Sequence, residues 1–164
     1  LNTKVDLIFI EPYPEERLNK MIKPSDTTIK LNKAFVQDIE LSFFKQLNSG
    51  DMLFIDSSHV SKAYSDLNYI LFEIIPVLKS GVYIHFHDVH YPFEYPKEWL
   101  YEGKAWNESY LVRSFLMYND AFEVSFMNSY LSMKYPKMYY ECFNDKSNYP
   151  LDISDAGSIW IRKK

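Results

Sequence analysis

The chain has 164 residues, of which 47% are hydrophobic, and its formal net charge at pH 7 is -4. This length and apolar content predict one folded domain with a core of its own. The acidic balance argues against a nucleic-acid partner, because phosphates require a basic surface. The single cysteine excludes both an internal disulfide and a cysteine-based zinc site.

Short apolar runs bounded by turn residues predict strands that alternate with helices in the first third of the chain. The run at 5–10 ends at Glu11 and is stopped by Pro12 and Pro14. Further strands are predicted at 27–32 and 52–55, and helices at 15–21 and 40–47.

A helix follows with the clearest pattern in the sequence. Apolar residues recur at the spacing of one buried helical face, namely Leu67, Ile70, Leu71, Ile74 and Leu78. Pro76 is expected to kink or shorten the last turn of this helix. A strand at 82–86 comes next, after the turn at Ser80 and Gly81.

The second half of the chain is less regular. A long aromatic loop is predicted from Asp88 to Trp106, and Asn107 is expected to cap a helix that runs to about Tyr118. Strands are predicted at 122–127 and 158–161 without a convincing helix between them, and 134–147 is ambiguous. The whole, 1–164, is therefore expected to be a single α/β domain with a doubly wound, mostly parallel sheet and an antiparallel C-terminal edge strand.

All four histidines lie within 59–90, close to two carboxylates that each follow a strand. Since ligand sites in open α/β sheets lie at the carboxyl ends of strands, Asp56 and Asp88 are expected to meet at one edge. Two carboxylates suit Mg²⁺, whereas His87 as a third ligand would favour manganese, iron or zinc. The alternative is that both aspartates merely cap helices.

Three more acidic or basic side chains stand where strands end. His59 could take a proton from a substrate hydroxyl, or be an ordinary loop histidine. Glu11 is placed to accept hydrogen bonds from a ribose, and Asp38 from an adenine amino group, although either could be a simple cap. The aromatic loop after His90 is either a binding wall for a sugar or flat acceptor, or a small core of its own.

In their order along the chain, these pieces resemble the class I S-adenosylmethionine-dependent methyltransferases, from their second strand to their seventh. The resemblance is closest to a branch with metal-associated O-methyltransferases of sugars and natural products, and it covers nearly the whole chain. It rests on Ile10-Glu11-Pro12, Val36-Gln37-Asp38, the stretch from Phe54 to His59, the turn from Leu78 to Gly81, and His87-Asp88.

The resemblance implies a function and a set of roles. The chain would be an S-adenosylmethionine-dependent O-methyltransferase of a Rossmann-like fold, or the C-terminal fragment of one, that acts on a small-molecule or glycan hydroxyl. Glu11 would hold the cofactor's ribose and Asp38 its adenine end. Asp56 and Asp88, with His87, would hold Mg²⁺ or another divalent metal, and His59 would be the base.

One part of the family pattern has no counterpart here. The family's first strand and its glycine-rich loop are missing, and the four glycines of the chain are isolated. Because that strand lies at the centre of the sheet, we expect the strand at 5–10 to lose a neighbour and the strand at 52–55 to expose a hydrophobic edge. A homo-oligomer, a rearranged sheet or a segment before Leu1 would compensate, and the chain alone is expected to have little activity.

Two other functions fit the same residues. One is a metal-dependent hydrolase or oxygenase that uses Asp56, His87, Asp88 and His85. The other is a non-catalytic module whose aromatic loop binds a glycan or a partner. No apolar run approaches the roughly 18 residues that cross a bilayer, and no signal peptide is recognisable, so we expect a cytoplasmic protein without a membrane contact.

Overall fold

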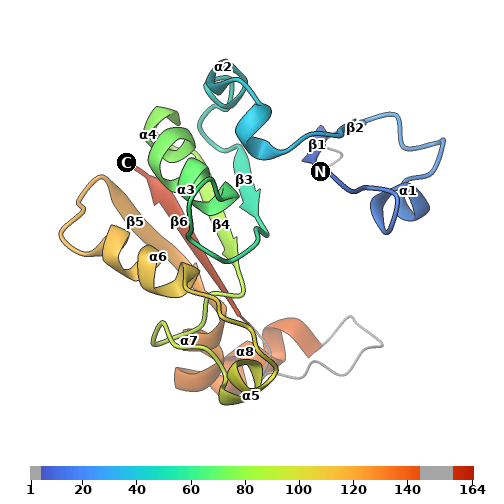
Figure 1. Ribbon diagram of the computed structural model, residues 1–164. Helices are drawn as coiled ribbons and strands as arrows, with labels where there is room; N and C mark the ends of the chain where they lie inside the picture. The colour runs from blue at the N-terminus through green and yellow to red at the C-terminus, as the bar shows by residue number, and fades with distance from the viewer. Residues whose placement is uncertain (1–4, 145–156) are drawn as a thin grey trace.

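A computed structural model describes residues 5–144 and 157–164 and arranges them in two sheets (Figure 1). The strands are β1 (Leu7–Ile10), β2 (Ile29–Asn32), β3 (Met52–Ile55), β4 (Tyr83–His87), β5 (Phe122–Met127) and β6 (Ser158–Lys163). β1 and β2 form a parallel pair, and the larger sheet has the order β3-β4-β6-β5. In the larger sheet β3 and β4 are parallel, whereas β6 is antiparallel to both of its neighbours.

Short helices connect these strands. They are α1 (Leu18–Met21), α2 (Leu41–Phe44), α3 (Asp66–Tyr69), α4 (Ile75–Val77), α5 (Lys97–Tyr101), α6 (Glu108–Leu116), α7 (Asn128–Lys134) and α8 (Pro136–Asn144). The predicted helices at 15–21 and 40–47 are both present but shorter. The segment Val36–Asp38, expected to be extended, forms the 3₁₀-helix η1, in which Asp38 N donates to Phe35 O.

The predicted crossover helix between β3 and β4 is present but irregular. α3 continues into the π-helical segment η2 (Ile70–Ile74) and then into α4, which contains Pro76. Because proline lacks an N–H and its ring clashes with the preceding turn, the backbone cannot keep a regular α-helical pattern up to Pro76. The apolar stripe still faces inward, since Leu67, Leu71 and Ile74 are all at least 96% buried.

Between β4 and β6 the structure is more helical than predicted. The aromatic loop contains α5, and α7 and α8 lie between β5 and β6, where no helix was expected. Of the ambiguous stretch 134–147, α8 covers 136–144, and 145–147 lie outside the described residues. Local sequence gave a weak signal here because α8 has no apolar stripe comparable to that of the crossover helix.

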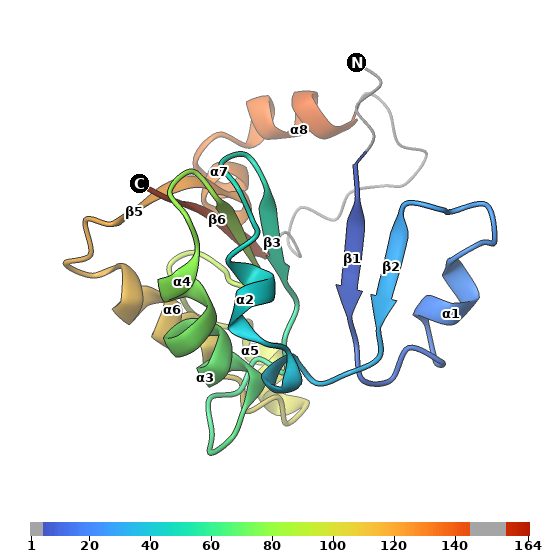
Figure 2. The same ribbon diagram turned by 90° about the horizontal axis from the view of Figure 1, so that it is seen from above.

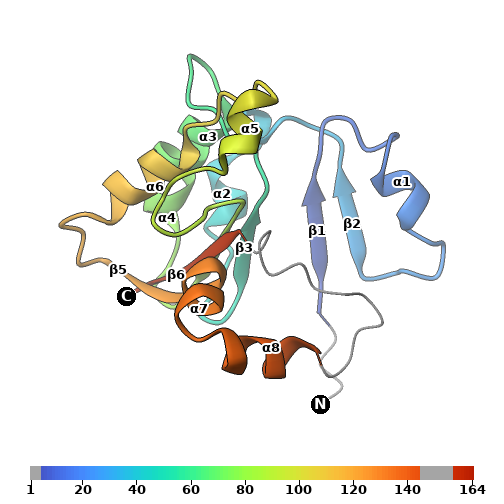
Figure 3. The same cartoon turned by 90° about the horizontal axis from the view of Figure 1, so that it is seen from below.

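Strand alternation builds the core on one face of the larger sheet. Ile55, Ile84, Phe86, Ile159 and Ile161 are buried there against α2, the crossover helix and α6. The views in Figures 2 and 3 place α7 and α8 on the opposite side of this sheet. This packing positions β3 and β4 side by side in the sheet.

The strands β1 and β3 each pair on one side only, as expected. β1 bonds to β2 and β3 bonds to β4, so the two sheets stand beside each other without a shared ladder among the described strands (Figure 3). On β3, Met52 is 48% and Phe54 56% exposed, which is high for apolar strand residues. The expectation of an exposed hydrophobic edge is therefore confirmed.

The fold class is confirmed as a mixed α/β, Rossmann-like arrangement with parallel strands joined by helical crossovers. One detail differs, because the C-terminal strand β6 is antiparallel but lies inside the sheet, and β5 forms the edge. No helix within 5–144 and 157–164 has the length and apolar character needed to cross a membrane.

Candidate active site

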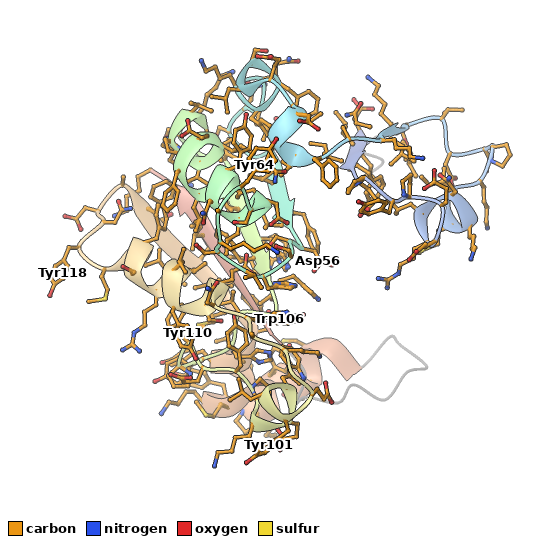
Figure 4. The ribbon with its side chains drawn as sticks, in the orientation of Figure 1. Asp56, Tyr64, Tyr101, Trp106, Tyr110 and Tyr118 are labelled. Carbon is orange, nitrogen blue, oxygen red and sulfur yellow. The ribbon has the colours of Figure 1, made fainter. Side chains whose placement is uncertain are left out.

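The two aspartates that follow β3 and β4 lie at the same edge of the sheet. The parallel register pairs Ile55 with Phe86, so the loops that begin at Asp56 and at Asp88 leave the sheet side by side. Asp56 is labelled at this edge in Figure 4. Asp88 adopts a left-handed conformation, φ 56°, and its backbone N–H donates to Gly157 O at 2.8 Å. The predicted convergence of the two strand ends is present.

His59 lies between these carboxylates. Its Nε2 is 3.4 Å from Asp56 Oδ1 and 3.9 Å from Asp88 Oδ2. The imidazole is buried, with 7% of its side chain exposed, whereas 52% of the Asp56 side chain and 22% of the Asp88 side chain remain open to solvent. Two solvent-accessible carboxylates therefore lie next to one nitrogen of a buried histidine.

A third carboxylate, Glu108, holds the other side of the His59 ring. Glu108 Oε2 lies 2.5 Å from His59 Nδ1, and Glu108 Oε1 accepts a hydrogen bond from Ser57 Oγ at 3.2 Å. Glu108 is only 1% exposed. Sequence reasoning missed this residue, because a glutamate in the first turn of a helix is ordinary helix chemistry and gives no sign of a partner 49 positions earlier.

These charges set the protonation behaviour of the pair. Burial by itself lowers the pKa of His59, but the hydrogen bond to Glu108 and the negative charges of Glu108, Asp88 and Asp56 outweigh it and raise the pKa above its ordinary value. Burial raises the pKa of Glu108, against the opposing effect of His59. The ring is therefore suited to hold a proton once it has received one.

Two further histidines, His85 and His87, lie on β4, on the face opposite to the core residues Ile84 and Phe86. His87 Nε2 is 3.6 Å from Asp88 Oδ1, and His87 Nδ1 is 3.4 Å from His85 Nε2. His85 is buried and stacks on Phe54 with ring centroids 4.3 Å apart. Burial and the proximity of His87 lower the pKa of His85 to about 4, so this ring is neutral at physiological pH.

The expected metal ligands are not assembled as a metal site. In the part of the chain that the structure describes, no group of three or more His, Cys, Asp or Glu side chains is placed to hold a metal ion. Asp56 and Asp88 both approach His59 Nε2, at 3.4 and 3.9 Å. The set Asp56, His87 and Asp88 therefore does not fit a metal in this arrangement.

The two predicted cofactor residues lie apart from this cluster. Glu11 follows β1, and its Oε1 accepts from Tyr13 N at 2.8 Å. Asp38 is exposed in η1 and lines a surface cavity of about 390 Å³ with Gln37, Glu40 and Tyr69. Among the described contacts, neither carboxylate bonds to His59 or its neighbours. Among the described residues, both keep carboxylate oxygens that accept no hydrogen bond, and their roles toward a ribose and an adenine stay predictions.

Aromatic side chains border the His59 cluster on the side of α5. The ring centroids of Trp106 and His59 are 4.1 Å apart. Trp99 contacts Trp106 edge-on, with ring centroids 5.1 Å apart. Lys104 Nζ sits 4.2 Å from the Trp99 ring centroid. Figure 4 shows Trp106 close to the end of β3 that carries Asp56. The predicted aromatic wall therefore touches the site, and it also packs as a small cluster of its own.

Comparison with known proteins gives a family match over the first half of the chain. Residues 1–89 match the family model described as a methyltransferase domain. The match includes Asp56, His59 and Asp88 and ends at residue 89, near the start of the aromatic loop and before α6 and Glu108. Searches among curated proteins and among solved structures gave no match.

Proposed function

Because this chain belongs to the methyltransferase-domain family, which its first 89 residues match, we propose that it methylates a hydroxyl of a sugar or related small acceptor, with His59 as the base. The observation that carries the proposal is the position of His59 Nε2 within 4 Å of both Asp56 and Asp88, at the carboxyl ends of two parallel strands. Hydroxyl methylation needs a proton acceptor at the reacting oxygen, and this nitrogen is the candidate.

S-adenosylmethionine, when bound, supplies an electrophilic methyl group on a sulfonium. The carboxylates of Glu11 and Asp38 would accept hydrogen bonds from its ribose and adenine, in line with the free oxygens that both side chains keep. Holding donor and acceptor in one geometry supplies much of the rate in such transfers, because a bimolecular reaction becomes effectively intramolecular.

The protein's own chemistry is a proton transfer. His59 Nε2 takes the proton of the acceptor hydroxyl as the oxygen bonds to the methyl carbon, and the electron pair of the broken carbon–sulfur bond stays on sulfur. The imidazolium that results lies beside Asp56, Asp88 and Glu108, whose negative charges stabilise it. The open carboxylates of Asp56 and Asp88 would also orient a neighbouring hydroxyl of the acceptor.

Metal assistance is a second possible role of Asp56 and Asp88. The described side chains form no group of three or more metal ligands, so the proposed proton transfer uses His59 and no ion. The same finding weakens the hydrolase or oxygenase alternative, which depends on that ligand set. Dialysis against a chelator tests whether turnover needs a metal ion. We expect turnover to survive. Loss of turnover that only added Mg²⁺ restores would instead support a metal-centred mechanism.

The substitution His59→Asn tests the proposal with little disturbance of the backbone. His59 has φ 58°, in the left-handed region, and asparagine tolerates that conformation better than most residues. We expect kcat to fall about 10²- to 10⁴-fold, the usual contribution of a general base. Turnover is measured as release of S-adenosylhomocysteine from the full-length protein with a panel of sugars and phenols.

Tyr64→Asn is the matched control. Tyr64 also has a left-handed backbone, φ 60°, and its side chain is 81% exposed (Figure 4). This variant should keep the turnover of the parent protein. If His59→Asn also kept it, the base would have to be another group and the proposal would fail.

A further inference from the structure

Glu108 is the most deeply buried carboxylate among the described residues. A buried carboxylate costs free energy unless partners satisfy it. Both of its partners, His59 and Ser57, come from the loop after β3, which carries the site. Ser57 Oγ also accepts from His59 N at 3.1 Å, so the three residues form one closed network.

The residues directly before Glu108 hold the same loop. The backbone N–H groups of Asn107 and Glu108 both donate to His59 O, at 3.0 and 3.2 Å. The Trp106 ring lies against the His59 ring. Three consecutive residues at the start of α6 therefore contact His59 through its carbonyl, its ring face and its Nδ1.

This arrangement determines which ring nitrogen is available. An ionised carboxylate can only accept hydrogen bonds, so a neutral His59 that is bonded to Glu108 must carry its proton on Nδ1. Nε2 is then left without a proton, and Nε2 is the nitrogen that faces Asp56 and Asp88. A second group that fixes the tautomer in this way is a recurring feature of histidine bases.

We infer that Glu108 is a positioning residue that locks His59 in the Nδ1-protonated tautomer and aims Nε2 at the acceptor hydroxyl. The catalytic part of this inference rests on the proposed function, whereas the tautomer itself does not. The family match ends before Glu108, so α6 contributes this part of the site from outside the matched region.

The substitution Glu108→Gln tests the inference. A neutral amide can turn its NH₂ group toward Nδ1 and so favour the opposite tautomer, and we expect kcat to fall about 10²- to 10⁴-fold while the KM for the acceptor changes little. Glu108→Asp keeps the charge on a shorter side chain and should restore part of the activity. Glu98→Gln, an exposed glutamate on α5, is the control and should behave like the parent.

The decisive measurement is the nitrogen-15 spectrum of histidine-labelled protein, in which the signal of His59 is identified by its loss in His59→Asn. At a pH above the raised pKa of His59, where the ring is neutral, the parent should show the Nδ1–H tautomer, and Glu108→Gln should shift the population toward Nε2–H. A parent spectrum with the proton on Nε2 would overturn the inference even if the variant failed to fold. So would an unchanged tautomer in a folded Glu108→Gln protein.

This readout separates the two proposals. If His59→Asn keeps full turnover but the tautomer follows Glu108, the proposed function fails and the positioning role stands. If His59→Asn loses turnover but the tautomer ignores Glu108, the base assignment stands and the positioning role is wrong.

Discussion

The side chain of Asn107 bonds to both backbone polar groups of Ser61: its Oδ1 accepts from Ser61 N at 2.6 Å and its Nδ2 donates to Ser61 O at 3.2 Å. The sequence predicts Asn107 as the cap of α6, yet this side chain makes no cap hydrogen bond to the helix. It ties the start of α6 to the loop of His59. The polar residue before the helix therefore serves tertiary structure in place of local capping.

Removing this pair of bonds should loosen the site. We expect Asn107→Ala to lower the free energy of unfolding by about 1–3 kcal/mol, the sum of two ordinary hydrogen bonds. Asn107→Asp keeps the acceptor and loses the donor, so its cost should be about half. Urea unfolding measures both, with Asn19→Ala on the exposed side of α1 as the control. Equal stability of Asn107→Ala and the parent would show that the two bonds contribute nothing net.

The carboxylate of Asp56 should affect turnover far more than the stability of the fold. Asp56 is half exposed and carries its charge in water, so Asp56→Asn should leave the unfolding curve nearly unchanged. Turnover should fall about 10²- to 10³-fold, because a preorganised charge next to the developing imidazolium is lost. Asp120→Asn, an exposed aspartate in the turn before β5, is the matched control. Parent-like kcat in Asp56→Asn would remove this carboxylate from the mechanism.

The convergence of Asp56, Asp88 and His59 could be predicted from the sequence because it depends on one simple fact. Two strands joined by a helical crossover run parallel, often as neighbours, and the residues that follow them meet at one edge. The apolar runs that define β3 and β4 are short and unambiguous, and β3 was predicted with its observed bounds.

Glu108 could not be predicted in the same way. Its contact with His59 depends on how the chain from Asp88 to Trp106 folds, and that stretch has no periodicity to read. The irregular turn of η2 is a similar case, since the apolar stripe predicts a helix but carries no information on its hydrogen-bond pattern. The expected metal set has no support from the described side chains, because spacing predicts which carboxylates approach one another but not whether their oxygens are placed around an ion.

The ring of Trp106 is expected to influence turnover through His59. Trp106→Phe keeps an aromatic face against the imidazole, whereas Trp106→Ala removes the contact at 4.1 Å and opens a cavity beside it. We expect a small change in kcat for the first variant and a loss of at least about tenfold for the second, since a misplaced base transfers protons less efficiently. Steady-state kinetics with the same acceptor measures both. A larger loss for Phe than for Ala would contradict a role in positioning.

His85 should make the fold sensitive to acid. Its ring lies between Phe54 and Trp160, with centroids 4.3 and 4.6 Å away, and its Nδ1 has no hydrogen-bond partner among the described residues. Burial, followed by the nearby His87, lowers its pKa to about 4, below the ordinary value of 6.5. Between these two values the unfolded chain binds more protons than the folded one, so stability must fall as the pH falls. The loss begins near pH 6.5 and is complete below about 4.

The expected size of the effect is on the order of 2 kcal/mol between pH 7.5 and pH 5.0, from the proton uptake of this one ring. His85→Phe keeps an aromatic ring in the same stack and cannot be protonated, so its stability should change less over that interval. Urea unfolding of both proteins at the two pH values gives the difference directly, and carboxylates that titrate in both cancel in the comparison. Equal losses in the parent and in His85→Phe would show that another group, and not His85, makes the fold sensitive to acid.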